Sequence, residues 1–461
     1  MADKHLKEIM KRFRPCSLDK PFLLPPSMDE WLPERHLARF VVGVVDELDL
    51  SEIISYHVRK DGRGKAAYHP AMLVRLLLYG YAVGMRSSRK IEKATYENIA
   101  FRYLAADQHP DHTVLADFRK THLEELSKIF VTTLQLCQKA GLVKLGQIAI
   151  DGTKVLANAS RQESKTYERL SEKEALLDAE VKRLLQEAAA VDAQEDQELG
   201  KGKQSDELPE SLATAERRLE KIRAAKEELE REAKQKAEQA AREQAEQNGK
   251  AHDEAQRKRW QRAKPGVPDA KTQGNLTDPE SRLMVDGANK TYVQAYNAQV
   301  AAAGVPQIIV AQTVTQAAND RQQLTPMVQQ VEQNVGRPEL TVADSGYWSE
   351  YEVAGLQTAG WDVLVPPDRG KKKDQDELPK NAPQGPAAKQ MRERLAQEEE
   401  QKRYRKRSGM VEPVFGLIKE ILGYRRFLLR GLKKVQGEWS LICASFNLRK
   451  LFLYGSQAAS Q

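Results

Sequence analysis

The sequence predicts an α+β or α/β protein in which a mixed sheet with flanking helices follows a helical region and is interrupted by a long helical insertion. Three observations lead to this prediction. Short helices with capping residues follow one another between Tyr68 and His122. Apolar runs rich in β-branched residues begin after Leu145 and again at Arg282. Between them, residues 161–262 are crowded with Glu, Lys, Arg, Gln and Ala, and their apolar residues recur at steps of seven, four and three.

Length and composition exclude several classes of protein. The chain has 461 residues and 40% hydrophobic content, which is enough for a sizeable core and excludes full disorder. It offers no run of about 18 apolar residues, so we expect no membrane span. The N-terminus lacks a charged-then-apolar signal segment, which predicts a cytoplasmic protein acting at the nucleoid. Three cysteines lie far apart in the sequence, and we expect them to be reduced core thiols.

Charge is strongly segregated although the net charge is only +7. Residues 59–102 contain ten Lys or Arg against three acids, and residues 401–434 contain eleven against two. Two separated basic surfaces suit a polyanion, because neutralising phosphates releases counterions. We therefore expect double-stranded DNA as a partner rather than two solvated charged faces.

The N-terminal part divides into two predicted units. Residues 1–66 form a Pro-rich N-terminal segment with a short apolar helix near 36–48. Residues 67–142 form a helical DNA-binding domain of the helix-turn-helix type. Basic residues near its helix starts are expected to meet phosphates. The predicted DNA contacts of this domain are Arg86, Ser88, Arg89, Lys90, Arg119 and Lys120.

The insertion, residues 161–272, is predicted to be an antiparallel coiled-coil hairpin, because two apolar stripes are separated by Gly200, Gly202 and Pro209. Its tip is expected within residues 195–205.

Residues 143–160 together with 273–455 are predicted to form the catalytic domain, and 456–461 a tail. The expected strands are 147–151, a segment beginning at 282, 292–303, 307–314, 340–343 and 361–365. A helix is expected over 319–335, a mobile loop over 366–400 and a helical region from Ser408 to Leu453, interrupted at two glycines.

Three acids stand at the ends of these elements. Asp151 ends the first strand, Asp344 follows another strand, and Glu412 precedes Pro413, which places it in the first turn of a helix. Strand-end carboxylates gather at one edge of a sheet, and oxygen ligands of this kind suit Mg²⁺. With 66 acids in the chain, this spacing alone has little weight.

The local motifs carry more weight. Residues 68–119, with Tyr68-His-Pro-Ala-Met and Arg86-Ser-Ser-Arg, resemble the N-terminal DNA-binding region of the DDE transposases of bacterial insertion sequences. Ala149-Ile-Asp-Gly-Thr-Lys, Val342-Ala-Asp-Ser-Gly-Tyr and the block from Tyr404 to Lys419 resemble the three catalytic blocks of this family. The resemblance spans most of the chain outside the insertion.

The resemblance implies an RNase H-like catalytic core with Asp151, Asp344 and Glu412 as catalytic and metal-binding residues. It also implies two Mg²⁺ (or Mn²⁺) ions, and DNA contacts by Lys154, Tyr404, Arg407 and Lys419. In the family the third block separates its Tyr, Arg, Glu and Lys by two, three and six residues. Here the separations are two, four and six.

Several of these residues also fit structural roles. Asp151 and Asp344 suit turn positions, and the run Glu398–Glu400 or Glu420 competes with Glu412 as third acid. His109, His112 and His122 suggest a zinc site, although turn and cap roles are favoured because no fourth ligand is present.

The function expected is DNA transposition: binding of the terminal inverted repeats, metal-dependent phosphodiester hydrolysis and 3′-OH strand transfer into target DNA. A homodimer or larger assembly is expected, because both element ends must be held together. The alternatives are a metal-dependent nuclease of the same fold and a non-catalytic DNA-binding regulator.

Overall fold

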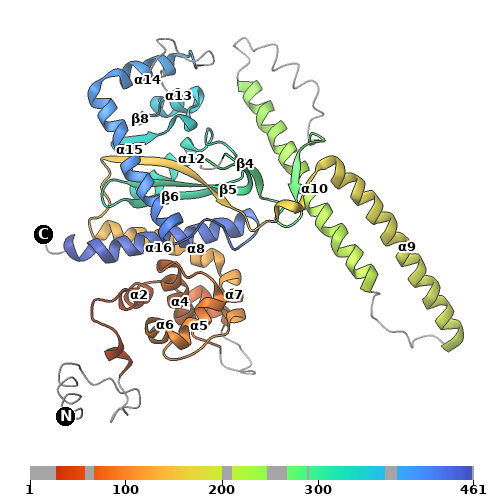
Figure 1. Ribbon diagram of the computed structural model, residues 1–461. Helices are drawn as coiled ribbons and strands as arrows, with labels where there is room; N and C mark the ends of the chain where they lie inside the picture. Colours follow the sequence, from red (N-terminus) through yellow and green to blue (C-terminus); the bar gives the residue numbers. More distant parts are fainter. Residues whose placement is uncertain are drawn as a thin grey trace, which may run out of the picture.

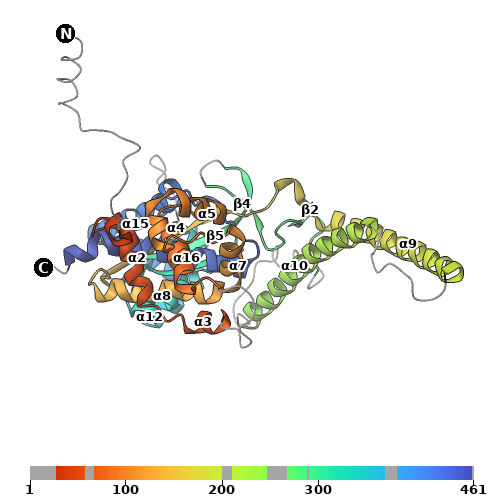
Figure 2. The same ribbon diagram turned by 90° about the horizontal axis from the view of Figure 1, so that it is seen from below.

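The computed structural model describes residues 27–57, 67–199, 210–246, 267–287, 290–368 and 382–458. In this part of the chain, a sheet with helices around it forms the body of the molecule, and two long helices project from it (Figure 1). Viewed at a right angle, these two helices still extend away from the body (Figure 2).

A mixed sheet lies at the centre of the body. Its strands are β1 (Gln147–Leu156), β4 (Arg282–Val285), β5 (Tyr292–Ala303), β6 (Ile308–Thr315), β7 (Leu340–Ala343) and β8 (Val363–Leu364). One edge of β5 pairs with β1, and the other pairs with β6 and, near its start, with β4, all antiparallel. β7 and β8 continue the sheet beyond β1 in parallel. The apolar runs of β5 and β7 are buried throughout most of their length, as expected for strands covered on both faces.

Helices cover the sheet. They are α12 (Leu324–Val335), α13 (Glu350–Thr358), α14 (Pro386–Ala396), α15 (Glu398–Gly416), the π-helical turn η4 (Leu417–Ile421) and α16 (Leu432–Ala458). α15 contacts β1, β5 and β7, whereas α12 contacts β6 and β5.

The N-terminal region is helical, as predicted. Its elements are η1 (Met28–Trp31), α2 (Leu37–Asp46), α3 (Ser51–His57), α4 (Pro70–Ala82), α5 (Ser88–Glu97), α6 (Ile99–Leu104), α7 (His112–Thr121) and α8 (Leu123–Lys139). α8 and α4 pack against α16, and the buried apolar residues of this region and of the sheet form one continuous cluster. The region therefore shares its core with the sheet.

We call α9 (Tyr167–Leu199) and α10 (Glu210–Glu246) the arm. Leu170 packs with Ile222 and Leu229, and Val181 packs with Leu212 and Leu219. This pairing shows that the two helices run antiparallel. Strands β2 (Ser164–Thr166) and β3 (Gln273–Asn275) pair at the base of the arm.

The base of the arm is also tied to the sheet by charge. Arg282 of β4 donates to Glu228 at 2.8 Å and to Glu232 at 2.7 Å, both on α10. The side chains of Arg282 and Glu228 are each only 10% exposed. Gln316 donates to the same Glu228. The arm is thus joined to the body by buried polar contacts as well as by the chain itself.

Several predicted boundaries are wrong. β1 continues five residues beyond Asp151, because residues 152–156 also pair with β5. α12 begins at Leu324 rather than at 319. α14 and the first three residues of α15 lie in the segment expected to be a loop, and α15 begins ten residues before Ser408, where a helical region was expected to start. Residues 369–381 of that predicted loop lie outside the described residues, as do residues 1–26 and 200–209 and the cysteine at position 16.

The predicted position of Glu412 in a first helical turn is also wrong. α15 starts at Glu398, so Glu412 lies in its second half and Pro413 lies inside the helix. A proline cannot donate to the carbonyl four residues earlier. That carbonyl, on Gly409, instead accepts from the Gln307 side chain at 3.5 Å.

Candidate active site

Two of the predicted acids lie on neighbouring strands. β1 and β7 are parallel, and Ile150 pairs with Ala343, so Asp151 and Asp344 are the next residues along the two strands. Adjacent strands lie about 4.8 Å apart. The Asp344 carboxylate accepts from the backbone N–H of Gly346 at 2.8 Å and caps a short 3₁₀ turn, η3 (Ser345–Tyr347). The turn role considered for Asp344 is therefore real, and it fixes the carboxylate beside Asp151.

Asp151 lies in a strongly polarised environment. Burial raises the pKa of its carboxyl group to about 6, the Arg407 guanidinium opposes this rise, and the carboxylates of Asp344 and Asp320 add to it. Arg407 Nη1 lies 3.3 Å from Asp151 Oδ2. α15 thus places the Arg407 guanidinium next to Asp151, the first predicted catalytic residue.

α15 also carries the third predicted acid. The Glu412 side chain is exposed. It makes no hydrogen bond or ion pair with any other residue that the structure describes, Asp151 and Asp344 included. Lys419, just beyond this helix, donates to Thr153 Oγ1 at 2.6 Å and to the Lys154 carbonyl at 2.8 Å. An ammonium group has three donors, so one remains for a further partner. Burial lowers the pKa of Lys419.

Tyr404 and Lys154 complete the predicted set. The Tyr404 ring lies 5.8 Å from the Arg407 guanidinium, and burial raises the pKa of its hydroxyl. The Lys154 ammonium lies 3.8 Å from Asp320 Oδ1, and burial lowers its pKa. Both side chains therefore face the acids rather than an open surface.

Asp320 is a site residue that the sequence analysis missed. It lies in the loop between β6 and α12, where a helix was expected from position 319. Asn297 and Gln299 of β5 donate to its Oδ1 at 2.6 and 2.7 Å. Polar residues alternating along an otherwise apolar strand, as these two do, are the signal that could have indicated a polar neighbour.

The acids offer carboxylate oxygens only, which suits Mg²⁺ or Mn²⁺. Two glycines allow the acids to approach the backbone closely: a Cβ on Gly152 would lie 2.8 Å from Asp320 Oδ1, and one on Gly346 would lie 2.9 Å from Asp344 Oδ1. The chemistry of these oxygen donors fits a divalent cation. The oxygens of Asp151, Asp320 and Asp344 are not all within 4.8 Å of one another, so they form no closed cage without movement of a side chain.

The predicted DNA contacts of the helical region fall into two groups. Arg89, Lys90 and Lys120 are exposed. Ser88 and Arg119 are buried, and Arg86 pairs with the buried Glu438 at 3.2 Å.

Arg119 and Arg86 are occupied inside the molecule. Arg119 donates to the Arg86 carbonyl at 2.9 Å, and the Arg86 guanidinium lies over the Tyr424 ring. Glu438 also accepts from the backbone N–H groups of Leu428 and Leu429. These positions favour a structural role for both arginines, in holding the helical region onto α16.

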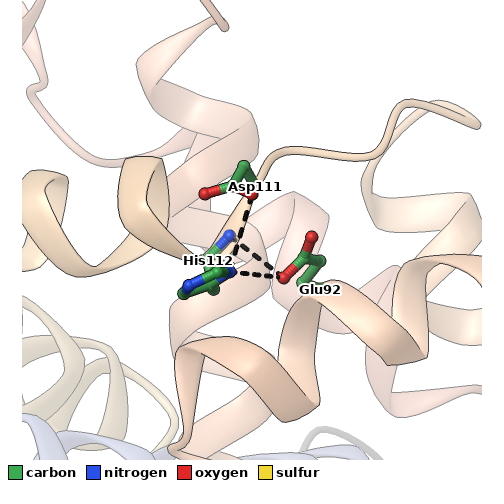
Figure 3. A group of neighbouring side chains, drawn as sticks. All are labelled: Glu92, Asp111 and His112. Atoms are coloured by element: carbon green, nitrogen blue, oxygen red, sulfur yellow. Dashed lines mark hydrogen bonds and ion pairs between the residues drawn. The ribbon is translucent and has the colours of Figure 1, made fainter.

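Figure 3 shows a separate group formed by Glu92, Asp111 and His112. Among the described residues, this is the group whose ligand atoms all lie within 4.8 Å of one another. His112 donates to Glu92 from its backbone N–H at 3.2 Å, and its Nδ1 lies 2.8 Å from the same oxygen. Asp111 caps α7 by accepting from Thr113. These bonds join the start of α7 to α5. The cap itself is Asp111, and His112 is the first residue of the helix.

His109 and His122 are held by local contacts as well. His109 stacks on Tyr96 with ring centroids 3.8 Å apart, and His122 lies 2.9 Å from His57.

Comparison with known families decides the identity. Residues 26–121 match a transposase domain (DUF772), and residues 369–452 match a transposase DDE domain. The chain belongs to the DDE transposases of insertion sequences. No curated protein and no solved structure matched it.

The two matched segments lie in different halves of the transposase. The first contains most of the helical region, and the second contains α15 with Glu412 and most of α16. Asp151, Asp320 and Asp344 lie between the two matches, so their roles rest on the geometry described above. No described helix of the transposase has the length and apolar character of a membrane span.

Proposed function

We propose that this transposase binds the terminal inverted repeats of its element, hydrolyses a phosphodiester bond at each end and transfers the freed 3′-OH to target DNA. The observation that carries the proposal is the parallel pairing of β1 with β7, which sets Asp151 beside Asp344. α15, packed on the same strand, supplies Glu412, whose carboxylate has no partner among the described residues. In this proposal, Glu412 joins Asp151 and Asp344 at this sheet edge when the metal binds.

Asp151, Asp344 and Glu412 would hold Mg²⁺ or Mn²⁺, with two ions expected. Bound divalent ions would activate the attacking hydroxyl and stabilise the leaving oxygen in an in-line displacement. Two basic residues, Arg407 and Lys419, have further roles in this proposal. Arg407 offsets the charge of Asp151 before the metal binds, and Lys419 holds the end of α15 against β1 with one donor left for a DNA phosphate.

We also infer that the catalytic domain is RNase H-like. Support comes from the strand order, in which three antiparallel strands (β6, β5, β1) are followed by two parallel ones (β7, β8). The arm, in the same proposal, is a coiled-coil hairpin. It would contact DNA or a second copy of the chain in the complex that joins both element ends.

For the helical region, we propose that Arg89, Lys90 and Lys120 contact DNA, because they are exposed on α5 and α7. Such phosphate contacts predict binding that weakens steeply as the salt concentration rises.

The test is a set of variants, Asp151→Asn, Asp344→Asn and Glu412→Gln, that keep side-chain shape and remove the anionic ligand. We expect each to lower cleavage and joining of DNA carrying the terminal repeats by at least about 100-fold, since losing one electrostatic stabiliser costs that much. Binding to the same DNA should change little. Glu332→Gln, which removes a charge from the exposed face of α12, is the control.

The outcomes separate the alternatives. Near-normal cleavage by any one of the three variants would show that its residue is not a metal ligand. Cleavage without joining by the wild-type protein would favour a nuclease of the same fold. Binding with no cleavage in Mg²⁺ or Mn²⁺ would favour a DNA-binding regulator.

A further inference from the structure

Asp320 is held by amides whose orientation is set by the core. The buried Tyr347 hydroxyl donates to Oε1 of Gln299, so the NH₂ group of Gln299 must point the other way. That group donates to Asp320 Oδ1 at 2.7 Å, and Asn297 donates to the same oxygen at 2.6 Å. One oxygen of the carboxylate is therefore locked in place.

The other oxygen, Oδ2, faces the predicted catalytic residues. A Cβ on Gly346 would lie 3.7 Å from Asp320 Oδ2 and 2.9 Å from Asp344 Oδ1, so the two carboxylates flank the space that this glycine leaves empty. Oδ2 accepts no hydrogen bond from any described residue. An oxygen of this kind is available to a ligand.

The carboxylates around Asp320 outnumber the basic side chains that pair with them, which favours binding of a cation. Three carboxylates, Asp151, Asp320 and Asp344, are accompanied by two nearby cations, which are Arg407 beside Asp151 and Lys154 beside Asp320. No ion pair to Asp344 is formed by any described residue. Carboxylates brought together out of bulk water are stabilised by binding a cation.

We propose that Asp320 is a further ligand of the divalent-metal centre, contributing Oδ2 while Asn297 and Gln299 hold Oδ1. This inference rests on the proposed function, since it adds a fourth carboxylate to the three-acid centre. In this proposal, Asn297 and Gln299 of β5 orient Asp320, which lies in the loop between β6 and α12.

Asp320→Asn is a sharp test of this role. The amide oxygen of Asn can accept from both Asn297 and Gln299, so the contacts that fix the loop remain, while Oδ2 becomes an NH₂ group. Mn²⁺ binding to the full chain without DNA is measured by titration calorimetry, with melting temperature as the check on folding. The matched control is Glu332→Gln on α12, which changes the net charge by the same amount.

We expect Asp320→Asn to weaken Mn²⁺ binding by at least about tenfold, Asp344→Asn to weaken it similarly, and Glu332→Gln to leave it unchanged. If Asp320→Asn binds Mn²⁺ like the wild type while Asp344→Asn does not, Asp320 is not a ligand and the proposed function stands. If neither variant loses affinity, the proposed metal centre itself is wrong.

A second measurement uses the unaltered protein, in case Asp320→Asn fails to fold. Fe²⁺ bound in place of Mg²⁺ generates hydroxyl radicals with peroxide and ascorbate, and these cut the chain near the ion. We expect cuts near residues 151, 344 and 320 that excess Mg²⁺ suppresses. Cuts near 151 and 344 with none near 320 would overturn the proposal.

Discussion

Gly152 lies opposite Gln299 in the ladder between β1 and β5. A Cβ at this position would meet the Gln299 amide and come within 2.8 Å of Asp320 Oδ1. The residue after the first predicted catalytic acid thus has no side chain because two polar groups occupy its place. At the residue scale, the site therefore requires a glycine at position 152 as well as its carboxylates.

Glu352 of α13 shows that burial perturbs acids outside the site as well. Burial raises the pKa of its carboxyl group to about 7, opposed by a backbone hydrogen bond from Thr325. Its Oε2 is buried without a hydrogen-bond partner among the described residues. The folded state therefore binds a proton here that the unfolded chain has already released above pH 4.5, and stability falls as the pH rises from 4.5 through 7.

We predict that Glu352→Gln changes stability little at pH 5 and stabilises the protein at pH 8 by on the order of 1–3 kcal/mol. Gln stays neutral at both pH values, so it escapes the cost of burying a charge. Melting temperatures measured at pH 5, 6, 7 and 8 would test this, with Glu332→Gln as the exposed control. A difference from the wild type that is equal at all four pH values would contradict the prediction.

At the scale of elements, the arm has two parts with different tasks. Its distal part is held by the small cluster around Val181 and Leu219, which touches nothing in the body. Its base packs through Leu170 and Leu229 and is tied to β4 by Arg282. The distal part should therefore be dispensable for folding, whereas the base should not.

We predict that replacing residues 178–219 by a short Gly/Ser linker leaves the melting temperature of the body nearly unchanged. Arg282→Met, in contrast, removes the guanidinium that joins Glu228 and Glu232 to β4, although Arg231 and Gln316 still contact Glu228. The variant should cost about 1–3 kcal/mol, because buried hydrogen bonds to a charged group are lost. Thermal unfolding and limited proteolysis at the base of the arm are the measurements. Unfolding of the body by the truncation would show that the distal helices support the core.

At the scale of the whole molecule, the helical region and the sheet are parts of one packing unit. α8 buries Leu126, Phe130 and Leu134 in a core that continues through α16 to β6. An ion pair also joins the two regions, because Arg86 of the helical region pairs with the buried Glu438 of α16. The predicted domain division at residue 142 therefore does not coincide with a gap in the packing.

We predict that a fragment of residues 27–142 does not fold cooperatively alone, because removing α16 exposes the apolar face of α8. It should bind a hydrophobic dye and lack a sharp thermal transition, and adding a peptide of residues 423–458 should restore one. DNA binding by Arg89 and Lys90 then has to be measured in the full chain. A cooperative transition of the fragment alone would show that the region is independent.

Periodicity and capping residues were enough to predict the classes of most elements: the helices starting near Pro70 and Ser88, the strands around Asp151 and Asp344, and the two arm helices. These signals are local, since capping and alternation act over a few residues. The transposase family was also predicted from short motifs, and the family matches confirmed it.

The tertiary structure decided what each polar residue faces. Arg86 and Arg119 were predicted DNA contacts because they are basic residues of the predicted helix-turn-helix region, yet long-range packing places them against Glu438 and Tyr81. Asp320 lies in a segment expected to be helical (319–335), and the pairing of β5 with β6 brings Asn297 and Gln299 to it. Partners more than twenty residues apart leave no trace in local patterning, because the hydrogen bond and the charge act through space and the chain path alone brings them together.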